Sequence, residues 1–353
     1  MSTDTVKVGI IGSMFAAELH VDGYRRLPHV EVVAVAAKTA EEAQPFAETY
    51  GIDRVFGDYH DLLALPEIDL VSAAIPNFLH HDVVLAACEA GKHVICEKPL
   101  ATSVADAEEM LAAAKQAGIK LMYAEDWVFA PALVRAKEII DEGAVGDVLF
   151  VKAKETHNGS HSIYAQTRKF CGGGAMIHLG IHPLGWVRWL KGCEIVEVMA
   201  RMTPGKDGNL LHKTYGGEDW SCAVVTFADG TFGFVEGNYI TPGGIDDRIE
   251  IYGQTGNVHI NLTQGSPVSV YSNPGYSYAI EKAETTVGWT RPAVDEWWQL
   301  GYANEIAHFV DCVRFDRDPA RGVRGEDGLA LMRVLEAIYA SAESGKAEKV
   351  KGL

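Results

Sequence analysis

Short apolar runs alternate with amphipathic stretches through the first third of the chain. β-branched runs such as "VKVGIIG" at 6–12 and "VEVVAVAA" at 30–37 are typical of buried strands, and the stretches after them have helical apolar spacing. The alternation continues through "DLVSAAIP" at 69–76 and "KHVICEKP" at 92–99. Strands joined by helices of this length form right-handed βαβ units. The pattern therefore predicts a parallel sheet, covered by helices on both faces, within residues 1–125.

The pattern changes after about residue 125. From residue 147 onwards the strand-like runs are longer, and "FADGTFGF" and "YGQTGNVHI" place turn residues between them, as hairpins do. We therefore predict an α/β protein in which residues 126–353 form a second, α+β domain with a large, mostly antiparallel open sheet. Helices are expected in this part of the chain at 131–142, 180–191, 297–314 and 326–345. The last two helices can also pack back on the first domain.

Composition and charge narrow the class of protein. A chain of 353 residues favours two domains, and its net charge of -17 disfavours nucleic-acid binding, which needs a basic surface. The six cysteines form no C-x-x-C pair, which argues against a zinc ribbon, an iron–sulfur cluster or a disulfide scaffold. The first apolar run is too short for a signal peptide, and no later run has the length of a membrane span. We expect a cytoplasmic protein with no membrane role.

The first strand-to-helix turn, "GIIGSMFAA", is where a dinucleotide would bind. In the G-x-G-x-x-G/A pattern, Gly12 and Ala17 fit the first and third places, but Met14 stands at the second. Binding survives this departure if the Met14 side chain points outwards, because the helix N-terminus still offers its N–H groups to a pyrophosphate. The alternative is a plain strand–turn–helix. The residues predicted to line this part of the site are Gly12, Ser13, Met14, Phe15 and Ala16.

The end of the second strand bears on the choice between NAD and NADP. NAD enzymes usually carry an acid there for the ribose hydroxyls, whereas this chain has Ala37 followed by Lys38 and Thr39. Lys38 and Thr39 would suit the 2′-phosphate of NADP, so the residues favour NADP(H). A solvated loop lysine with no such role is the open alternative.

Two longer segments carry a family resemblance. "AIPNFLHHDVVLAACEAGKHVICEKPLA" at 74–101 and "GGGAMIHLGIHPLGWVRWL" at 172–190 resemble the glucose-fructose oxidoreductase / inositol dehydrogenase (Gfo/Idh/MocA) family. The likeness runs almost the full chain. It implies an N-terminal Rossmann domain that binds NAD(P), and a C-terminal domain whose open sheet often mediates dimer or tetramer assembly. It also implies redox chemistry on a sugar, inositol or related polyol.

The resemblance also implies roles for particular residues. Pro76, Asn77 and His80 would lie beside the cofactor, and so would Glu97, Lys98 and Glu125, with Lys98 also reaching the substrate hydroxyl. The family usually has an aspartate at the position of His178 and a histidine at that of His182. His182 matches the family and His178 does not.

Alcohol oxidation needs a cation for the developing alkoxide and a base for the hydroxyl proton. Lys98 suits the first role and His182 the second, because an unperturbed imidazole titrates near ~6.5. With no carboxylate at position 178, we expect a neutral His182 that is ready to accept a proton, and a His178 that binds a substrate hydroxyl. The glycines at 172–174 are expected to make room for substrate and cofactor.

Other residues near these segments are candidate substrate contacts. They are Asp126, Trp127, His157, His161, Tyr164 and Arg168, of which the aromatic side chains could stack on sugar C–H surfaces. We expect no bound metal. A zinc site that uses His178 and His182, four residues apart, is the open alternative.

These features together predict an NAD(P)-dependent dehydrogenase or reductase. It would transfer a hydride between the nicotinamide and a secondary alcohol or ketone of a sugar, glycoside or cyclitol. Its expected partners are a small-molecule sugar or polyol and further copies of the chain, in a homodimer or homotetramer. Two alternatives stay open: an NAD-dependent redox-assisted glycosidase, and a non-catalytic Rossmann-type sensor or regulatory subunit.

Overall fold

The computed structural model describes residues 5–160, 162–263, 265–266, 268–277 and 285–353. The chain divides into two compact units. The first comprises Met1–Asp126 and Gly301–Met332, and the second comprises Trp127–Leu300 and Arg333–Leu353. The stretch 301–332 therefore belongs to the first unit although it follows the second in sequence. In the described parts of the chain, no helix is both long and apolar enough to cross a membrane.

A six-stranded parallel sheet forms the centre of the first unit, as the sequence predicts. Its strand order is β3-β2-β1-β4-β5-β6. The strands are β1 (Val6–Ile11), β2 (Val30–Ala36), β3 (Arg54–Phe56), β4 (Leu70–Ala73), β5 (His93–Cys96) and β6 (Leu121–Tyr123). The order reverses between β1 and β4, and in sheets of this kind ligands bind beyond the carboxyl ends of the strands at that reversal. The fold thus directs attention to the loops that follow β1, β4 and β5.

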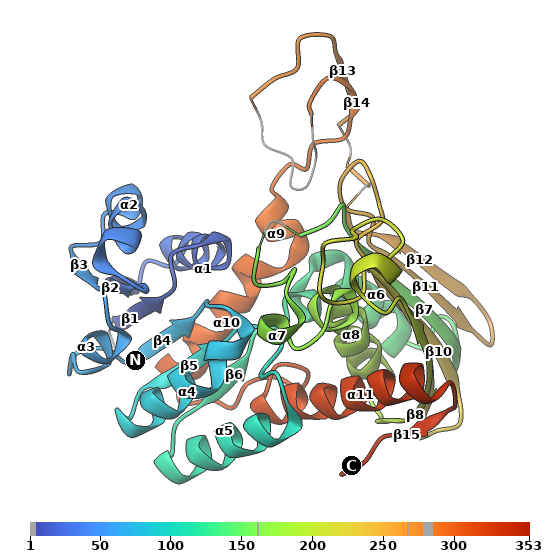
Figure 1. Cartoon of the computed structure of the whole chain (residues 1–353), viewed down its shortest axis with the longest axis horizontal. Coiled ribbons are helices and arrows are strands. Elements are labelled where there is room, and N and C mark those ends of the chain that lie inside the picture. The colour runs from blue at the N-terminus through green and yellow to red at the C-terminus, as the bar shows by residue number, and fades with distance from the viewer. Residues whose placement is uncertain (1–4, 161, 264, 267, 278–284) are drawn as a thin grey trace. The chain divides into compact units, whose positions relative to one another are not determined.

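Helices accompany this sheet as the βαβ pattern requires. They are α1 (Phe15–Arg25), α2 (Ala40–Tyr50), α3 (Tyr59–Leu63), α4 (His80–Glu89), α5 (Val104–Ala117) and α10 (Tyr302–Arg314). Helix α1 lies along α10, and α4 lies along α5 (Figure 1). The central strands are mostly apolar and buried between these layers; Val8, Ile10 and Val71 have no exposed surface.

A seven-stranded sheet dominates the second unit, in the order β12-β11-β7-β10-β9-β8-β15. Its strands are β7 (Val148–Thr156), β8 (Ile195–Met202), β9 (Trp220–Phe227), β10 (Phe232–Asn238), β11 (Arg248–Gly253), β12 (Asn257–Asn261) and β15 (Glu348–Lys349). Strands β7 and β10 pair in parallel, and the other neighbouring pairs are antiparallel. The predicted, mostly antiparallel sheet is confirmed. Strands β13 (Val270–Ser272) and β14 (Gly288–Thr290) form a separate pair.

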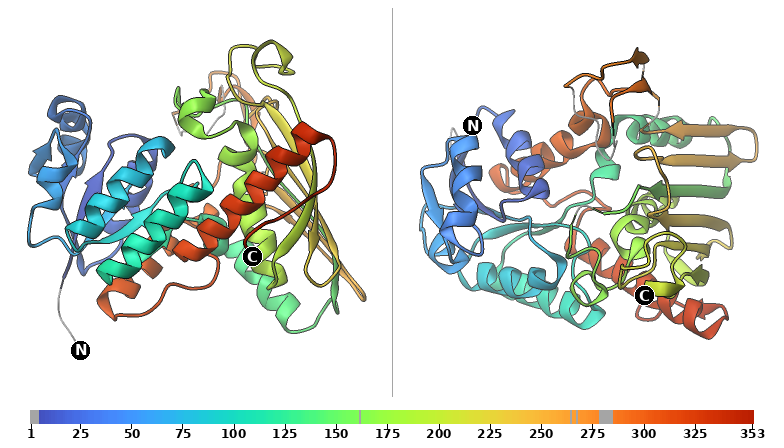
Figure 2. Two further views of the ribbon diagram at one scale, coloured as in Figure 1. Left: turned by 60° about the horizontal axis from the view of Figure 1, so that its bottom comes forward. Right: turned by 45° about the horizontal axis from the view of Figure 1, so that its top comes forward.

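Helices cover one face of the second sheet. They include α6 (Pro131–Asp141), α7 (Arg168–Cys171), α8 (Ile181–Lys191), α9 (Glu296–Leu300) and α11 (Gly325–Ser344). Helix α8 packs on β7 and β10 (Figure 2). The side chains that alternate to the opposite face include the exposed apolar residues Met199, Val224 and Phe232. These three residues define the outer sheet face, an apolar surface that is exposed in a single chain.

The observed helices differ from the predicted ones in two places. The segment expected as one helix over 297–314 ends at Leu300 and restarts at Tyr302, because Gly301 between them has a φ of +106°. Helix α8 begins at Ile181 and follows a π-helical turn, Met176–Gly180. Such turns are often found at functional sites, and the regular spacing of four residues does not hold through them.

Glu305 of α10 is a buried acid that was not among the residues predicted from the sequence. Its side chain is 1% exposed, and its Oε1 atom has no hydrogen-bond partner among the described residues. Burial raises the pKa of Glu305 well above its ordinary value, and the negative charges of Asp126 and Glu97 raise it further. Folding therefore favours the protonated form of Glu305.

The raised pKa makes the stability of the fold depend on pH. Above pH 4.5, the ordinary pKa of a glutamate, the unfolded chain releases the Glu305 proton more readily than the folded chain does, so folding stability falls as the pH rises. Glu305→Gln cannot ionise. Relative to the wild type, it should gain about 1.4 kcal/mol of stability at pH 8 for each unit by which the pKa is raised. Urea unfolding at pH 5 and pH 8 measures this gain.

The comparison between the two pH values carries the test, because any packing cost of the amide is common to both. The exposed residue Glu89 of α4 provides the control variant, Glu89→Gln, which should show no such change. A stability difference between Glu305→Gln and the wild type that is the same at both pH values would contradict a protonated Glu305.

Candidate active site

The turn after β1 brings three strand ends close together. Gly12 has a φ of +115°, and a Cβ atom there would lie 2.0 Å from the carbonyl oxygen of Ala74. Its N–H donates to the carbonyl of Ala36, at 2.8 Å, at the end of β2. Glycine is thus required at this place by the backbone itself, which agrees with its predicted role as the first glycine of a dinucleotide turn.

Met14 stands where the usual pattern has a second glycine, and its side chain points outwards. It is 56% exposed, and Phe15 beside it is 42% exposed. Met14 is the N-cap residue of α1, and no side chain caps that helix. The N–H groups of the first turn, over residues 14–16, are therefore suited to bind a pyrophosphate. The outward Met14 side chain meets the condition stated above for dinucleotide binding without a second glycine.

The loop after β2 holds Lys38 and Thr39, the residues predicted for the 2′-phosphate. Lys38 is exposed. The Thr39 hydroxyl accepts a hydrogen bond from the N–H of Glu42, at 3.2 Å, and so caps α2. The sequence contains the signal for this cap, since a threonine three residues before a glutamate forms a capping box. Thr39 therefore has a structural role besides any role toward the cofactor.

His80 joins the loops that follow β4 and β5. The turn Asn77–Leu79 follows Pro76, and His80 opens α4 with no exposed surface. Its Nδ1 lies 2.8 Å from the carbonyl of Pro99, and its Nε2 lies 3.0 Å from that of Ile75. Burial lowers the pKa of His80 below its ordinary value. The ring is thus engaged by backbone groups, and it holds in place the loops expected beside the cofactor.

The segment Glu97–Lys98–Pro99 follows β5. Glu97 is buried, accepts a hydrogen bond from Nε2 of His20 at 2.9 Å, and accepts one from the N–H of Lys98 at 3.1 Å. Burial raises the pKa of Glu97, but the hydrogen bond and charge of His20 and the charge of Lys98 together lower it below its ordinary value. An ionised carboxylate therefore lies directly beside the half-buried Lys98.

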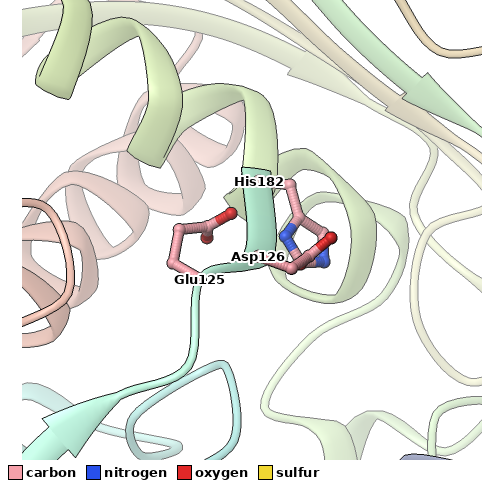
Figure 3. Close-up of side chains that lie close together, drawn as sticks. All are labelled: Glu125, Asp126 and His182. Carbon is pink, nitrogen blue, oxygen red and sulfur yellow. The ribbon is translucent and has the colours of Figure 1, made fainter. Parts of the chain in front are cut away.

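Two predicted residues stand where the chain leaves the first unit. Glu125 and Asp126 follow β6 and are buried, whereas His182 belongs to α8 of the second unit (Figure 3). Trp127, the first residue of the second unit, is also buried. Its ring stacks on that of His182, with the ring centroids 6.0 Å apart and the planes 21° apart. Trp127 thereby fixes the orientation of the His182 ring.

Glu155 of β7 is the carboxylate partner of His182, and it was not predicted. Its Oε2 lies 3.9 Å from Nε2 of His182, and its Oε1 lies 3.2 Å from Nε2 of His157. The expectation of a neutral His182 considered position 178 alone and did not include this carboxylate. A negative charge at this distance stabilises the positive charge that the ring acquires when it takes up a proton. The alternation Glu155–His157, which places both side chains on one face of a strand, was the available signal.

His178 lies in the π-helical turn and is held by Tyr239. Its Nδ1 is 2.5 Å from the Tyr239 hydroxyl. Burial raises the pKa of Tyr239 well above its ordinary value, so the phenol keeps its proton. The hydroxyl and Nδ1 share one hydrogen bond, whose donor depends on the tautomer of the ring. His178 differs from an aspartate at this place because an imidazole can donate a hydrogen bond as well as accept one.

The glycines before this turn make room for the protein and not for a ligand, which corrects the expectation. A Cβ atom on Gly173 would lie 1.9 Å from the hydroxyl oxygen of Tyr339, and one on Gly174 would lie 2.3 Å from the carbonyl oxygen of Glu218. The Glu218 carboxylate also accepts hydrogen bonds from the N–H groups of Gly174 and Met176. The glycines allow this contact, which anchors the start of the turn.

The remaining predicted substrate contacts lie in the second unit. His157 is buried beside Glu155, Tyr164 packs edge-on against Phe170, and the guanidinium of Arg168 lies over the Tyr339 ring. His161 lies outside the described residues. Among these residues, only the geometry of His157 ties it directly to the Glu155–His182 pair.

Comparisons with known proteins agree with this geometry. Residues 6–125 match the oxidoreductase family with an NAD-binding Rossmann fold, and residues 133–259 match the GFO/IDH/MocA C-terminal domain. Trans-1,2-dihydrobenzene-1,2-diol dehydrogenase of Xenopus laevis is 32% identical over 250 residues, which cover 70% of this chain and 72% of that protein. The scyllo-inositol 2-dehydrogenase (NAD(+)) of Bacillus subtilis is 28% identical over 297 residues, or 83% and 81% of the two chains.

A solved structure is similar over nearly the whole chain. The crystal structure of GenD2 from gentamicin A biosynthesis, in complex with NAD, has a TM-score of 0.92 and 27% identity, covering 99% of this chain and 97% of GenD2. The parallel sheet with its dinucleotide turn, the Glu97–Lys98–Pro99 segment and both family matches lead to one conclusion. The chain belongs to the Gfo/Idh/MocA family of oxidoreductases.

Proposed function

We propose that the protein is an NAD(P)-dependent dehydrogenase acting reversibly on a secondary alcohol of a sugar, glycoside or cyclitol. Relatives named as a scyllo-inositol dehydrogenase and a D-apiose dehydrogenase support this substrate class. The single observation that carries the proposal is the His182 imidazole beside the Glu155 carboxylate, 3.9 Å apart, because this pair supplies a base whose protonated form is stabilised.

The first unit would hold the dinucleotide. Its turn at residues 12–16 suits the pyrophosphate, and the loops after β2, β4, β5 and β6 supply the other predicted contacts: Lys38, Thr39, Pro76, Asn77, His80, Glu97, Lys98 and Glu125. When bound, the nicotinamide supplies the acceptor for the substrate hydride. The close crossing at Gly12 and the uncapped start of α1 fit such a ligand.

The side chains then divide the proton chemistry between them. The Lys98 ammonium binds the reacting hydroxyl oxygen and stabilises the negative charge that develops on it. His182 takes the hydroxyl proton, and whichever ring nitrogen takes it, the resulting imidazolium has Nε2 3.9 Å from Glu155 Oε2. His178 donates from Nε2 to a second substrate oxygen. In this proposal Tyr239 holds Nδ1 of His178, so the other ring nitrogen is the one assigned to the substrate. The proposal requires no metal.

We also propose that the protein is a homodimer or homotetramer assembled through the outer sheet face. Its three exposed residues, Met199, Val224 and Phe232, form the kind of apolar surface that marks protein contacts. The molar mass in solution tests this point, and a monomer at micromolar concentration would refute it.

None of the six cysteines forms a disulfide, which supports the expected cytoplasmic location.

Replacing Lys98 or His182 tests the assigned chemistry. Lys98→Ala and His182→Ala should each lower turnover by about 10²-fold or more, the usual contribution of a positioned acid, base or charge. Nicotinamide absorbance, followed across a panel of sugars and cyclitols with NAD and NADP, measures turnover. Lys115→Ala, at an exposed lysine of α5, is the matched control. Near-normal rates in either active-site variant, with the fold intact, would refute its role.

Lys38→Ala tests the preference for NADP. If Lys38 binds the 2′-phosphate, its loss should raise the KM for NADP about tenfold, roughly the value of one charge-assisted hydrogen bond, and leave the KM for NAD unchanged. Steady-state kinetics with each cofactor measure both constants. A wild-type enzyme that prefers NAD, with constants that Lys38→Ala does not alter, would end the NADP assignment.

A further inference from the structure

A chain of hydrogen bonds runs from α1 to the Glu97–Lys98–Pro99 segment through the interior of the first unit. Nε2 of His20 lies 2.9 Å from Glu97 Oε1, and Nδ1 of the same ring lies 3.0 Å from Ser72 Oγ. The Tyr24 hydroxyl lies 2.7 Å from that Ser72 oxygen. His20, Ser72 and Tyr24 are each no more than 1% exposed. None of these three residues was predicted from the sequence.

The Glu97 carboxylate fixes one hydrogen of this chain. Glu97 is ionised, so the nitrogen of His20 that faces it must carry a hydrogen and donate it, whatever the charge on the ring. Burial raises the pKa of Tyr24, so its phenol stays protonated beside Ser72. The Ser72 hydroxyl lies within hydrogen-bond distance of Nδ1, the other ring nitrogen. The His20 ring is therefore held on both sides, with a hydrogen on Nε2.

This chain does not connect the site with solvent. It ends at Tyr24, which is 1% exposed and keeps its proton. A proton relay needs an exit, so the chain is suited to hold a side chain in place and not to carry protons. The side chain it holds is Glu97, whose second oxygen accepts the N–H of Lys98.

The backbone on the other side of Lys98 is fixed as well. His80 binds the carbonyl of Pro99, one residue further along the chain. Lys98 thus lies between two fixed points, one made by Glu97 and one by His80. Only the first depends on α1, the helix whose N-terminus faces the predicted pyrophosphate site.

We propose that His20 is a positioning residue: its Nε2 hydrogen orients the Glu97 carboxylate, and through it the backbone of Lys98, so that the Lys98 ammonium is held where the reacting hydroxyl binds. This inference rests on the proposed role of Lys98. It adds a residue of α1 to the machinery and couples the helix of the dinucleotide turn to the segment that binds the substrate oxygen.

Two substitutions separate the two contacts of the His20 ring. His20→Gln places an amide nitrogen where Nε2 lies and keeps the donor to Glu97. His20→Asn ends where Nδ1 lies, so it keeps a partner for Ser72 and loses the donor to Glu97. Tyr24→Phe removes a buried hydrogen bond of the same chain without touching Glu97, and it serves as the control for a merely structural role.

His20→Asn should lower kcat/KM by about 100-fold, the loss expected when a reacting group is misplaced by about 1 Å. It should also bind NADH more weakly, as measured by fluorescence titration. His20→Gln should restore most of both losses, and Tyr24→Phe should keep wild-type kinetics. The role of His20 would be overturned if His20→Asn kept wild-type kinetics and NADH affinity while Lys98→Ala was inactive. That result would leave the proposed function intact.

The proposed function can fail independently. If Lys98→Ala turns over normally, the proposed role of Lys98 is wrong. NADH affinity then tests only whether His20 orients the Glu97 carboxylate. Weaker affinity in His20→Asn that is restored in His20→Gln supports orientation of Glu97 by His20, and equal affinities overturn it. If His20→Asn does not fold, ¹⁵N NMR of wild-type histidines, assigned by the signal that His20→Gln removes, decides the point. A hydrogen on Nε2 supports the proposal, and a hydrogen only on Nδ1 overturns it.

Discussion

Burial of the Glu97 carboxylate at the end of β5 is the constraint on which the site of the first unit depends. Removing an ionised carboxylate from water costs several kcal/mol unless donors replace the lost hydration. Here the donors come from α1, through His20, and from the next peptide, through the N–H of Lys98. Satisfying one charge therefore ties together the first helix, the fourth strand through Ser72, and the segment that carries Lys98.

The second unit applies the same logic to its histidines. His157 and His182 share Glu155, whereas His178 is hydrogen-bonded to the Tyr239 hydroxyl. Three imidazoles that look alike in sequence thus differ in their partners. The pair on Glu155 is suited to hold positive charge, and His178 has a neutral partner.

Much of the fold could be predicted from periodicity. The βαβ alternation and the change to a mostly antiparallel sheet after about residue 125 follow from local spacing. The site was predictable only in part, because its decisive contacts join residues far apart in sequence. His20 and Glu97 are separated by 77 positions, and no local pattern pairs them. The contact of Glu155 with His182 also joins two distant segments. Gly173 and Gly174 were misread because Tyr339 and Glu218, which they accommodate, come much later in the chain.

In the proposed reaction the protein moves a hydride directly between a carbinol carbon and the nicotinamide. A substrate found in the sugar and cyclitol panel, deuterated at the reacting carbon, tests this transfer most directly. We expect the deuterium to appear in the reduced nicotinamide released to solution, as measured by mass spectrometry. Deuterium that returns to the product or exchanges with water, with no net release of reduced cofactor, would contradict it and would favour a redox-assisted elimination.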